Sequence, residues 1–137
     1  MIEIKNISKK FGKLEVLKNV SVSCNSGQCI ALIGPNGCGK TTLIKSILGM
    51  VIPDSGSMEF NEKSIFGDYL YREKIGYMPQ IGRYPDTMTI GEIIEMVKKI
   101  RNSKDNLDED LFRDFEIEKM LNKQMRTLSG GTTQKIS

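Results

Sequence analysis

Histidine is absent from the 137-residue sequence and cysteine is scarce, which removes the usual ligands of a zinc site. The three cysteines are Cys24, Cys29 and Cys38, and their spacing matches no common metal-binding pattern. Any one disulfide would leave the third cysteine unpaired, so a reducing compartment is the simpler interpretation. We expect neither a structural zinc site nor a disulfide framework.

Long hydrophobic runs are also missing. The longest apolar stretches, around Cys29–Ile33 and Ile47–Ile52, are far shorter than the roughly 18 to 20 residues that cross a bilayer. The first ten residues, MIEIKNISKK, lack the apolar middle and the small-residue cleavage site of a secretory signal. We therefore expect no membrane span in this sequence and a cytoplasmic location.

Neither sign of charge is in large excess. The 20 basic and 17 acidic residues give a net charge of +3 and are mixed along the chain. This charge is too weak and too dispersed to indicate a nucleic-acid surface, so no nucleic-acid partner is expected. An apolar content of 39% is typical of a globular domain that buries a core.

The N-terminal part carries strand patterns. Ile2–Ile7 and Val16–Cys24 alternate apolar and polar residues, which predicts two half-buried antiparallel strands joined by a turn at Gly12. Cys29–Ile33 is a short, continuous apolar run, as in a strand that is buried on both faces. Together these segments predict an antiparallel edge followed by a buried strand.

Helices and further strands are expected after this run. Apolar residues recur at helical spacing over 43–48, just before Gly49, which predicts a helix. Met58–Phe60 and Ile75–Met78 are predicted as short strands. Beyond Thr89 the pattern becomes helical. Ile90, Ile93, Ile94 and Val97 share one helical face, and Leu107–Leu121 predicts further amphipathic helix.

Residues 34–41 satisfy the phosphate-loop pattern G-x-x-x-x-G-K-[ST] between the predicted buried strand and the predicted helix. The glycines let backbone N–H groups point inward at an anion, and the helix N-terminus adds partial positive charge. Lys40 can reach the β- and γ-phosphates, and the Thr41 hydroxyl is placed to bind Mg²⁺. The predicted ligand is a nucleoside triphosphate. Its expected binding residues here are Gly34, Pro35, Asn36, Gly37, Cys38, Gly39, Lys40, Thr41 and Thr42.

Cys38, within this loop, is interpreted as a small filler rather than a nucleophile. We expect its alkylation to impair nucleotide binding.

Leu128–Thr132 reads Leu-Ser-Gly-Gly-Thr, which resembles the signature of ATP-binding cassette (ABC) proteins. The resemblance covers essentially the whole chain in the family's order: Phe11, the phosphate loop, Tyr77–Gln80, Tyr84–Thr89 and the signature. It implies an α/β fold, namely a P-loop NTPase cassette core with an antiparallel β edge and a helical subdomain, incomplete at the C-terminus. The core with the phosphate loop and Q-loop is expected over residues 1–85. The helical subdomain, ending at the signature, is expected over residues 86–137.

The resemblance implies roles for five further residues. Phe11 occupies the place of the aromatic residue that stacks on adenine, although an alternative is that it fills the core. Gln80 matches the glutamine that contacts Mg²⁺ and the attacking water and that links to the transmembrane partner. Ser129, a good helix N-cap, with Gly130 and Gly131 matches the signature that binds the γ-phosphate held by a second protomer. A head-to-tail dimer around two ATP molecules is implied.

Some family features differ or are missing in these residues. Thr132 stands where the family most often has glutamine, and the run from Leu128 resembles cassettes of the exporter type. No apolar run is followed by Asp-Glu, which would bind Mg²⁺ and activate water, and the switch histidine is absent. Lys135–Ser137 lies inside the signature helix without a stop signal, so we expect a fragment. It should bind ATP with negligible turnover, and no catalytic residue is assigned beyond the water-positioning Gln80.

The expected function at full length is that of an ATPase subunit of an ABC transporter on the inner face of the cell membrane. Its expected partners are permease subunits and a second cassette. One alternative is a cassette ATPase of ribosomes or DNA, which usually has tandem cassettes or a long coiled coil; residues 81–127 show no sustained heptads. A GTPase would have Asn-Lys-x-Asp, whereas Asn122–Met125 reads Asn-Lys-Gln-Met. A naturally truncated, nucleotide-binding regulatory partner is a further alternative.

Overall fold

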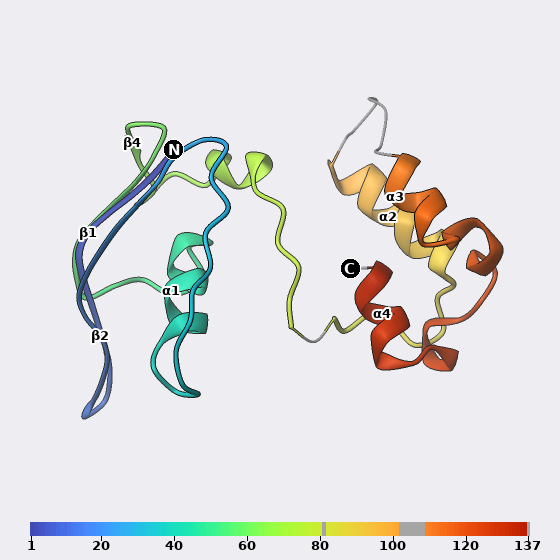
Figure 1. The fold of residues 1–137 in the computed structure, drawn as a ribbon, viewed down its shortest axis with the longest axis horizontal. Coiled ribbons are helices and arrows are strands. Elements are labelled where there is room, and N and C mark those ends of the chain that lie inside the picture. Colours follow the sequence, from blue (N-terminus) through green and yellow to red (C-terminus); the bar gives the residue numbers. More distant parts are fainter. Residues whose placement is uncertain (81, 102–108, 137) are drawn as a thin grey trace. The chain divides into compact units, whose positions relative to one another are not determined.

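The computed structural model describes residues 1–80, 82–101 and 109–136, which form two compact units, Met1–Ile75 and Gly76–Ser137 (Figure 1). Each unit has its own hydrophobic core. The division between the two units comes after Ile75, earlier in the chain than the boundary expected after residue 85. The expected boundary between the nucleotide-binding core and the helical subdomain stays a prediction. No helix within the described ranges has the length and apolar character needed to cross a membrane.

The first unit contains an antiparallel sheet of four strands in the order β2-β1-β3-β4. The strands are β1 (Ile2–Phe11), β2 (Leu14–Cys24), β3 (Ser55–Phe60) and β4 (Lys63–Ser64). The predicted pair of N-terminal strands is confirmed, and so is the turn, where Gly12 has a φ of 59°. The short strand predicted at Met58–Phe60 is the second half of β3.

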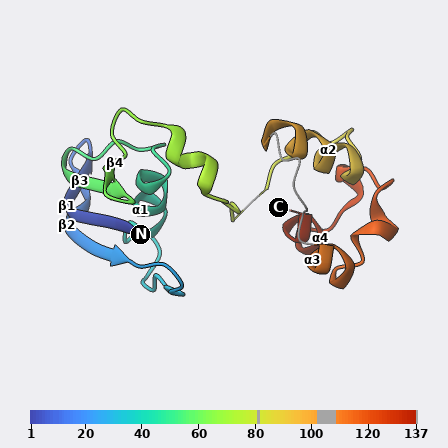
Figure 2. The ribbon, with the colours of Figure 1, turned by 90° about the horizontal axis from the view of Figure 1, so that it is seen from above.

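Helix α1 (Lys40–Ile47) packs on one face of this sheet (Figure 2). Its Leu43 side chain joins a core that contains Ile4, Ile7 and Met58, which are at most 1% exposed. Burying one such side chain stabilises a fold by about 1.5 to 3 kcal/mol. The rest of that core is Leu17, Ile65 and Tyr71. The helix predicted over 43–48 is therefore confirmed, and the core holds it against the sheet.

The C-terminal end of α1 is held by the 3-10 helix Leu70–Lys74. The Tyr71 hydroxyl donates to the carbonyl of Ile47 at 2.9 Å, and Arg72 Nη2 donates to the carbonyl of Gly49 at 3.0 Å. The last carbonyls of a helix, such as that of Ile47, have no partner within the helix. Tyr71 satisfies this carbonyl, and Arg72 satisfies the carbonyl of Gly49, two residues beyond the helix. The position of α1 is thus fixed at its C-terminal end as well as along its apolar face.

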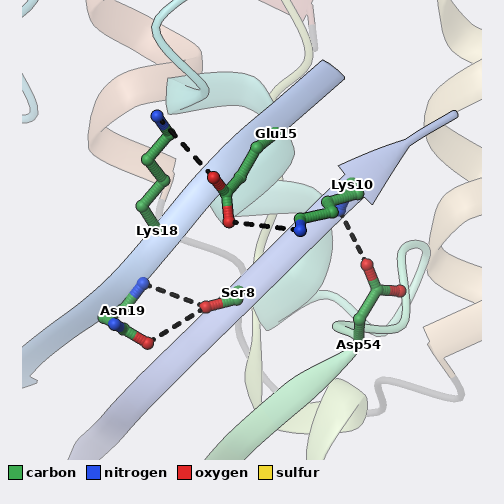
Figure 3. A network of polar contacts seen from close by, with 6 residues as sticks. All are labelled: Ser8, Lys10, Glu15, Lys18, Asn19 and Asp54. Atoms are coloured by element: carbon green, nitrogen blue, oxygen red, sulfur yellow. Dashed lines mark hydrogen bonds and ion pairs between the residues drawn. The ribbon is translucent and has the colours of Figure 1, made fainter. Parts of the chain in front are cut away.

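The pairing of β1 with β2 is interrupted by bulges at Asn6 and Asn19, which adopt positive φ angles of 51° and 46°. Asparagine tolerates this left-handed conformation better than most residues. Ser8 Oγ donates to Asn19 Oδ1 at 3.2 Å and accepts the N–H of Asn19 at 3.0 Å (Figure 3). Ser21 makes the matching pair of bonds with Asn6. The bulged positions therefore keep their polar groups bonded.

Two predicted strands are not formed. Cys29–Ile33 has no strand structure, and its Ile30, Leu32 and Ile33 are 49%, 46% and 91% exposed. A strand buried on both faces needs neighbouring strands in a sheet, and none of the four described strands pairs with this run. The prediction at Ile75–Met78 is wrong in this structure for the same reason. An apolar run indicates that a segment favours burial, but it does not indicate whether neighbouring strands are available to pair with it.

The second unit is helical. It contains α2 (Ile90–Arg101), α3 (Glu109–Asp114), α4 (Gly130–Ile136) and 3-10 helices at Ile117–Met120 and Met125–Thr127. The predicted helix after Thr89 is confirmed, and it begins with a capping box. The N–H of Thr89 donates to Glu92 Oε2 at 2.8 Å, and the N–H of Glu92 donates to Thr89 Oγ1 at 3.2 Å. Ile90, Ile93, Ile117 and Met125 form the buried core.

The helix predicted over Leu107–Leu121 is not continuous. Residues 107 and 108 lie outside the described residues, and α3 ends at Asp114. Glu116 then has a φ of 51°, a left-handed conformation that an α-helix cannot contain. The chain resumes as the 3-10 helix that buries Ile117. The apolar periodicity predicted helical structure in this range but not the break at Glu116.

Candidate nucleotide-binding site

The loop that enters α1 is organised around the ammonium group of Lys40. Lys40 Nζ donates to the carbonyls of Gly34 and Pro35, both at 2.7 Å, and lies 3.7 Å from Cys38 Sγ. The Lys40 side chain therefore points from the start of α1 back into the loop that precedes this helix. This geometry places one positive charge at the centre of a turn of backbone, as the recognition of a phosphate group requires.

Gly39 joins this loop to the sheet. Its φ is 95°, and a Cβ atom there would lie 2.7 Å from the carbonyl oxygen of Val16 and 3.0 Å from Leu17 Cδ2. Only glycine can both adopt this φ without strain and approach strand β2 so closely. Gly39 is also the N-cap of α1 and provides no side-chain hydrogen bond to the helix. The first N–H groups of α1 are therefore not capped by a side chain and can serve an anion.

Phe11 lies at the end of the hairpin formed by β1 and β2, where it pairs with Leu14. In Figure 1 this hairpin end and the loop that enters α1 lie at the same, lower side of the first unit. The close contact of Gly39 with Val16, two residues after Leu14, agrees with that view. Phe11 is 51% exposed, so the alternative that it fills the core is wrong. An aromatic face and a phosphate loop therefore lie in the same region.

Mg²⁺ with a nucleoside triphosphate fits the residues present. Thr41 is exposed on the first turn of α1, one residue beyond Lys40. Within the described residues, no three side chains of histidine, cysteine, aspartate or glutamate gather as a metal site. The cation would therefore be bound mainly by phosphate oxygens and water, with the Thr41 hydroxyl as one protein ligand, as Mg²⁺ prefers. Thr42 contributes to the helix itself, since its carbonyl accepts the Ser46 hydroxyl at 2.9 Å.

The signature residues begin α4 in the second unit. The N–H of Thr132 donates to Ser129 Oγ at 3.3 Å, so the serine is the side-chain N-cap that the sequence predicted. The two hydroxyls of Ser129 and Thr132 are 2.9 Å apart. Apart from its chain neighbours and the backbone of its own helix, a Cβ atom at Gly130 or Gly131 would meet nothing within 4 Å among the described residues. Packing within this unit therefore does not explain why both positions are glycine.

The segment before the signature is attached to the start of α2. The N–H of Gly91 donates to the carbonyl of Leu121 at 2.9 Å, and the N–H of Met125 donates to the carbonyl of Met88 at 2.9 Å. Leu128 packs against the core of the unit. These contacts fix where α4 begins. Gln80 belongs to the same unit, is exposed and lies in a segment without helix or strand.

Residues 17–137 match the family described as ABC transporter, a range that includes the whole phosphate loop and the signature. The chain belongs to the ABC transporter family. A sulfate/thiosulfate import ATP-binding protein, CysA, of Pectobacterium atrosepticum is 33% identical over 144 residues, which cover 99% of this chain and 44% of that protein. The chain thus spans less than half the length of this curated ABC relative.

Solved ABC structures share the fold. An ATP-binding subunit of an ABC transporter superposes with a TM-score of 0.85 and 28% identity, covering 98% of this chain and 58% of that one. The cassette MJ0796, in a dimeric post-hydrolysis state bound to ADP and Pi, superposes with a TM-score of 0.78. It is 22% identical, over 99% of this chain and 66% of that one, and so shows the fold alone. The expected α/β cassette core is therefore confirmed.

Sequence patterns did not identify Asp54 as part of this region of the ABC chain. By its sequence, Pro53–Gly56 predicts only a break between elements, because this combination is typical of turns. In the structure, the Asp54 carboxylate bonds to Lys9 and Lys10, the two residues before Phe11. An aspartate within a turn gives no signal of which distant strand it will contact.

Proposed function

We propose that this chain is the nucleotide-binding part of the ATPase subunit of an ABC transporter and that it binds ATP with Mg²⁺. The observation that carries the proposal is the arrangement of Lys40 and Gly39. The ammonium group of Lys40 is centred in the loop, and Gly39 holds the uncapped start of α1 against β2. An exposed aromatic ring, Phe11, belongs to the same unit.

The proposed roles follow from the chemistry of each group. Lys40 exchanges its bonds to loop carbonyls for bonds to the β- and γ-phosphates, because charge-assisted hydrogen bonds to phosphate are stronger than bonds to neutral carbonyls. The loop N–H groups and the start of α1 surround the phosphates, and Thr41 binds the cation that they share. Phe11 stacks on the base, a contact worth about 1 to 3 kcal/mol. Gln80 is proposed to contact Mg²⁺ and the attacking water.

The signature is proposed to act on the nucleotide of a second protomer. Ser129, Gly130 and Gly131 start a helix, and neither glycine is explained by packing inside its own unit. A ligand from outside the unit would explain both, because phosphate oxygens can approach a backbone that has no Cβ atom. Further proposed partners are transmembrane permease subunits, with the protein on the inner face of the cell membrane.

Transport substrate and direction are assigned to the permease. The relative of P. atrosepticum is named for sulfate and thiosulfate import, whereas the signature with Thr132 resembles cassettes of the exporter type. No described residue of this chain is proposed to contact the transported molecule.

The 137 residues are proposed to bind ATP without measurable turnover. They contain no apolar run followed by Asp-Glu and no histidine, so the general base and the switch residue of the family are absent from them. Loss of a general base alone lowers rates by about 10² to 10⁴. Steady Mg²⁺-dependent release of phosphate by the purified chain would contradict this part of the proposal.

Binding is tested by calorimetric titration with ATP and Mg²⁺ in two matched variants. Lys40→Met removes the central ammonium group, and Lys45→Met removes an exposed lysine from the last turn of the same helix. A hydrogen bond to a charged group is worth about 1.5 to 3 kcal/mol, so Lys40→Met should weaken binding roughly 10- to 150-fold. Lys45→Met should bind like the parent chain. Equal affinities for the parent and Lys40→Met would refute the proposed site.

A further inference from the structure

The end of strand β1 is supported on two different sides. On one side β1 pairs with β2 as far as Phe11, which lies opposite Leu14. On the other side the pairing with β3 stops at Ser8, opposite Ser55. The last three residues of β1 therefore have no strand neighbour on the β3 side. A strand edge without a partner presents free N–H and carbonyl groups.

Asp54, the residue just before β3, bonds to β1 beyond the point where the pairing of β1 with β3 stops. Its N–H donates to the carbonyl of Ser8 at 2.8 Å. Its Oδ2 accepts the N–H of Lys10 at 2.7 Å, as Figure 3 shows. Its Oδ1 accepts a hydrogen bond from Lys9 Nζ, also at 2.7 Å. Asp54 thus bonds to three consecutive residues of β1, up to the residue next to Phe11.

The same contacts reach the Phe11 ring. Lys9 Nζ, bound to Asp54, lies 5.5 Å from the centroid of that ring. A cation at this distance from an aromatic face is attracted to it and limits where the ring can lie. The Lys9 side chain is only 17% exposed, and its ammonium group is bound to the Asp54 carboxylate. The carboxylate of Asp54 is therefore connected to Phe11 through the backbone at Lys10 and through the side chain of Lys9.

We propose that Asp54 is a positioning residue for the base of the nucleotide, acting by holding the Phe11 ring beside the phosphate loop. This inference rests on the proposed stacking of the base on Phe11. Asp54 itself touches neither the base nor the phosphates. Asp54 lies in the loop between α1 and β3, so it connects the phosphate-loop helix with the end of β1. The segment that leaves the phosphate-loop helix thereby fixes the strand end that carries the aromatic residue.

The test compares two ligands, ATP and inorganic triphosphate, each with Mg²⁺, because only ATP has a base. The dissociation constant of triphosphate divided by that of ATP measures how much of the affinity for ATP comes from the nucleoside. Phe11→Ala should lower this ratio roughly 5- to 150-fold, the loss expected for a base-aromatic stack. Asp54→Asn, which keeps the shape but removes the charge, should weaken ATP binding about 3- to 10-fold and leave triphosphate binding unchanged. Asp54→Ala should approach the effect of Phe11→Ala.

Two controls separate positioning from a general loss of structure. Glu3→Gln removes a similar ion pair, that of Glu3 with Lys5 at 3.1 Å, from the opposite end of β1, and it should leave the ratio unchanged. In the Phe11→Ala background, Asp54→Asn should have no further effect on ATP binding, because coupled residues are not additive. Circular dichroism and the melting temperature show whether each variant is folded.

Each outcome decides a different statement. If Phe11→Ala leaves the ratio unchanged, the proposed base stacking fails, and the inference on Asp54 fails with it. If Phe11→Ala lowers the ratio but Asp54→Asn lowers affinity for both ligands equally, or for neither, only the inference on Asp54 is overturned. Additive effects of the two substitutions overturn it as well.

Discussion

Replacing Gly39 by alanine tests the contact that holds the phosphate loop against the sheet. The position has a φ of 95°, and an added Cβ atom would lie 2.7 Å from the carbonyl oxygen of Val16. A non-glycine residue in the left-handed region costs about 1 to 2 kcal/mol. An overpacked contact against backbone adds about 1 to 3 kcal/mol. We expect Gly39→Ala to lower the free energy of unfolding by about 2 to 5 kcal/mol.

Gly27 provides the matched control for this substitution. Its φ of 76° is also positive, but a Cβ atom there would meet nothing within 4 Å. Gly27→Ala should therefore cost only the conformational part, about 1 to 2 kcal/mol. The difference between the two variants isolates the contact of the loop with β2.

The assay is urea unfolding followed by far-ultraviolet circular dichroism, with calorimetric titration of ATP and Mg²⁺ on the same samples. Gly39→Ala should also bind ATP more weakly, because relief of the contact moves the start of α1. Gly27 lies outside the loop, so its variant should bind ATP normally. If the two variants lose the same amount of stability and both bind ATP normally, the reasoning about Gly39 is refuted.

Three further predictions follow from other parts of the chain. Alkylation of Cys38 should weaken ATP binding, because the thiol lies 3.7 Å from the ammonium group of the loop lysine; unchanged affinity after complete modification, checked by mass spectrometry, would contradict this. Hydrogen bonds from Lys9 and from the Lys10 N–H hold the pKa of Asp54 below its ordinary value of 3.8. The stabilising contribution of the Asp54 carboxylate is therefore complete above that value and is lost as the pH falls through the lower, folded-state pKa. The free energies of unfolding of the parent chain and Asp54→Asn, measured by urea unfolding at decreasing pH, should therefore converge at low pH. Thr89→Ala should destabilise the second unit by about 0.5 to 2 kcal/mol in thermal unfolding, through loss of the capping box of α2.

Local patterns in the sequence predicted those elements whose stability comes from nearby residues. The alternation in the N-terminal segments predicted the hairpin of β1 and β2, because a period of two places one face toward the core. The apolar spacing over 43–48 predicted α1, and the apolar face formed by Ile90, Ile93, Ile94 and Val97 predicted α2. The phosphate loop was recognisable because its chemistry requires glycines and a lysine at fixed spacing within eight residues.

The predictions that failed concern a segment that needs distant partners and a helix that one residue interrupts. Cys29–Ile33 has the composition of a buried strand, but the described strands of the sheet are antiparallel and none pairs with it. The helix predicted over Leu107–Leu121 breaks near Glu116, where backbone conformation overrides apolar periodicity. Neither the missing strand partners nor the helix break can be recognised from the local sequence.

By itself, the sequence determined that the chain contains a phosphate loop on a helix, an aromatic residue upstream of it and a signature that begins a second helix. These features are local, since each requires particular residue types within a few positions. Only the tertiary structure decided that Gly39 contacts Val16, that Phe11 is exposed, and that Asp54 holds the end of β1. Those facts depend on contacts between residues far apart in the chain. Such contacts arise from packing and strand register, which no local pattern of residues encodes.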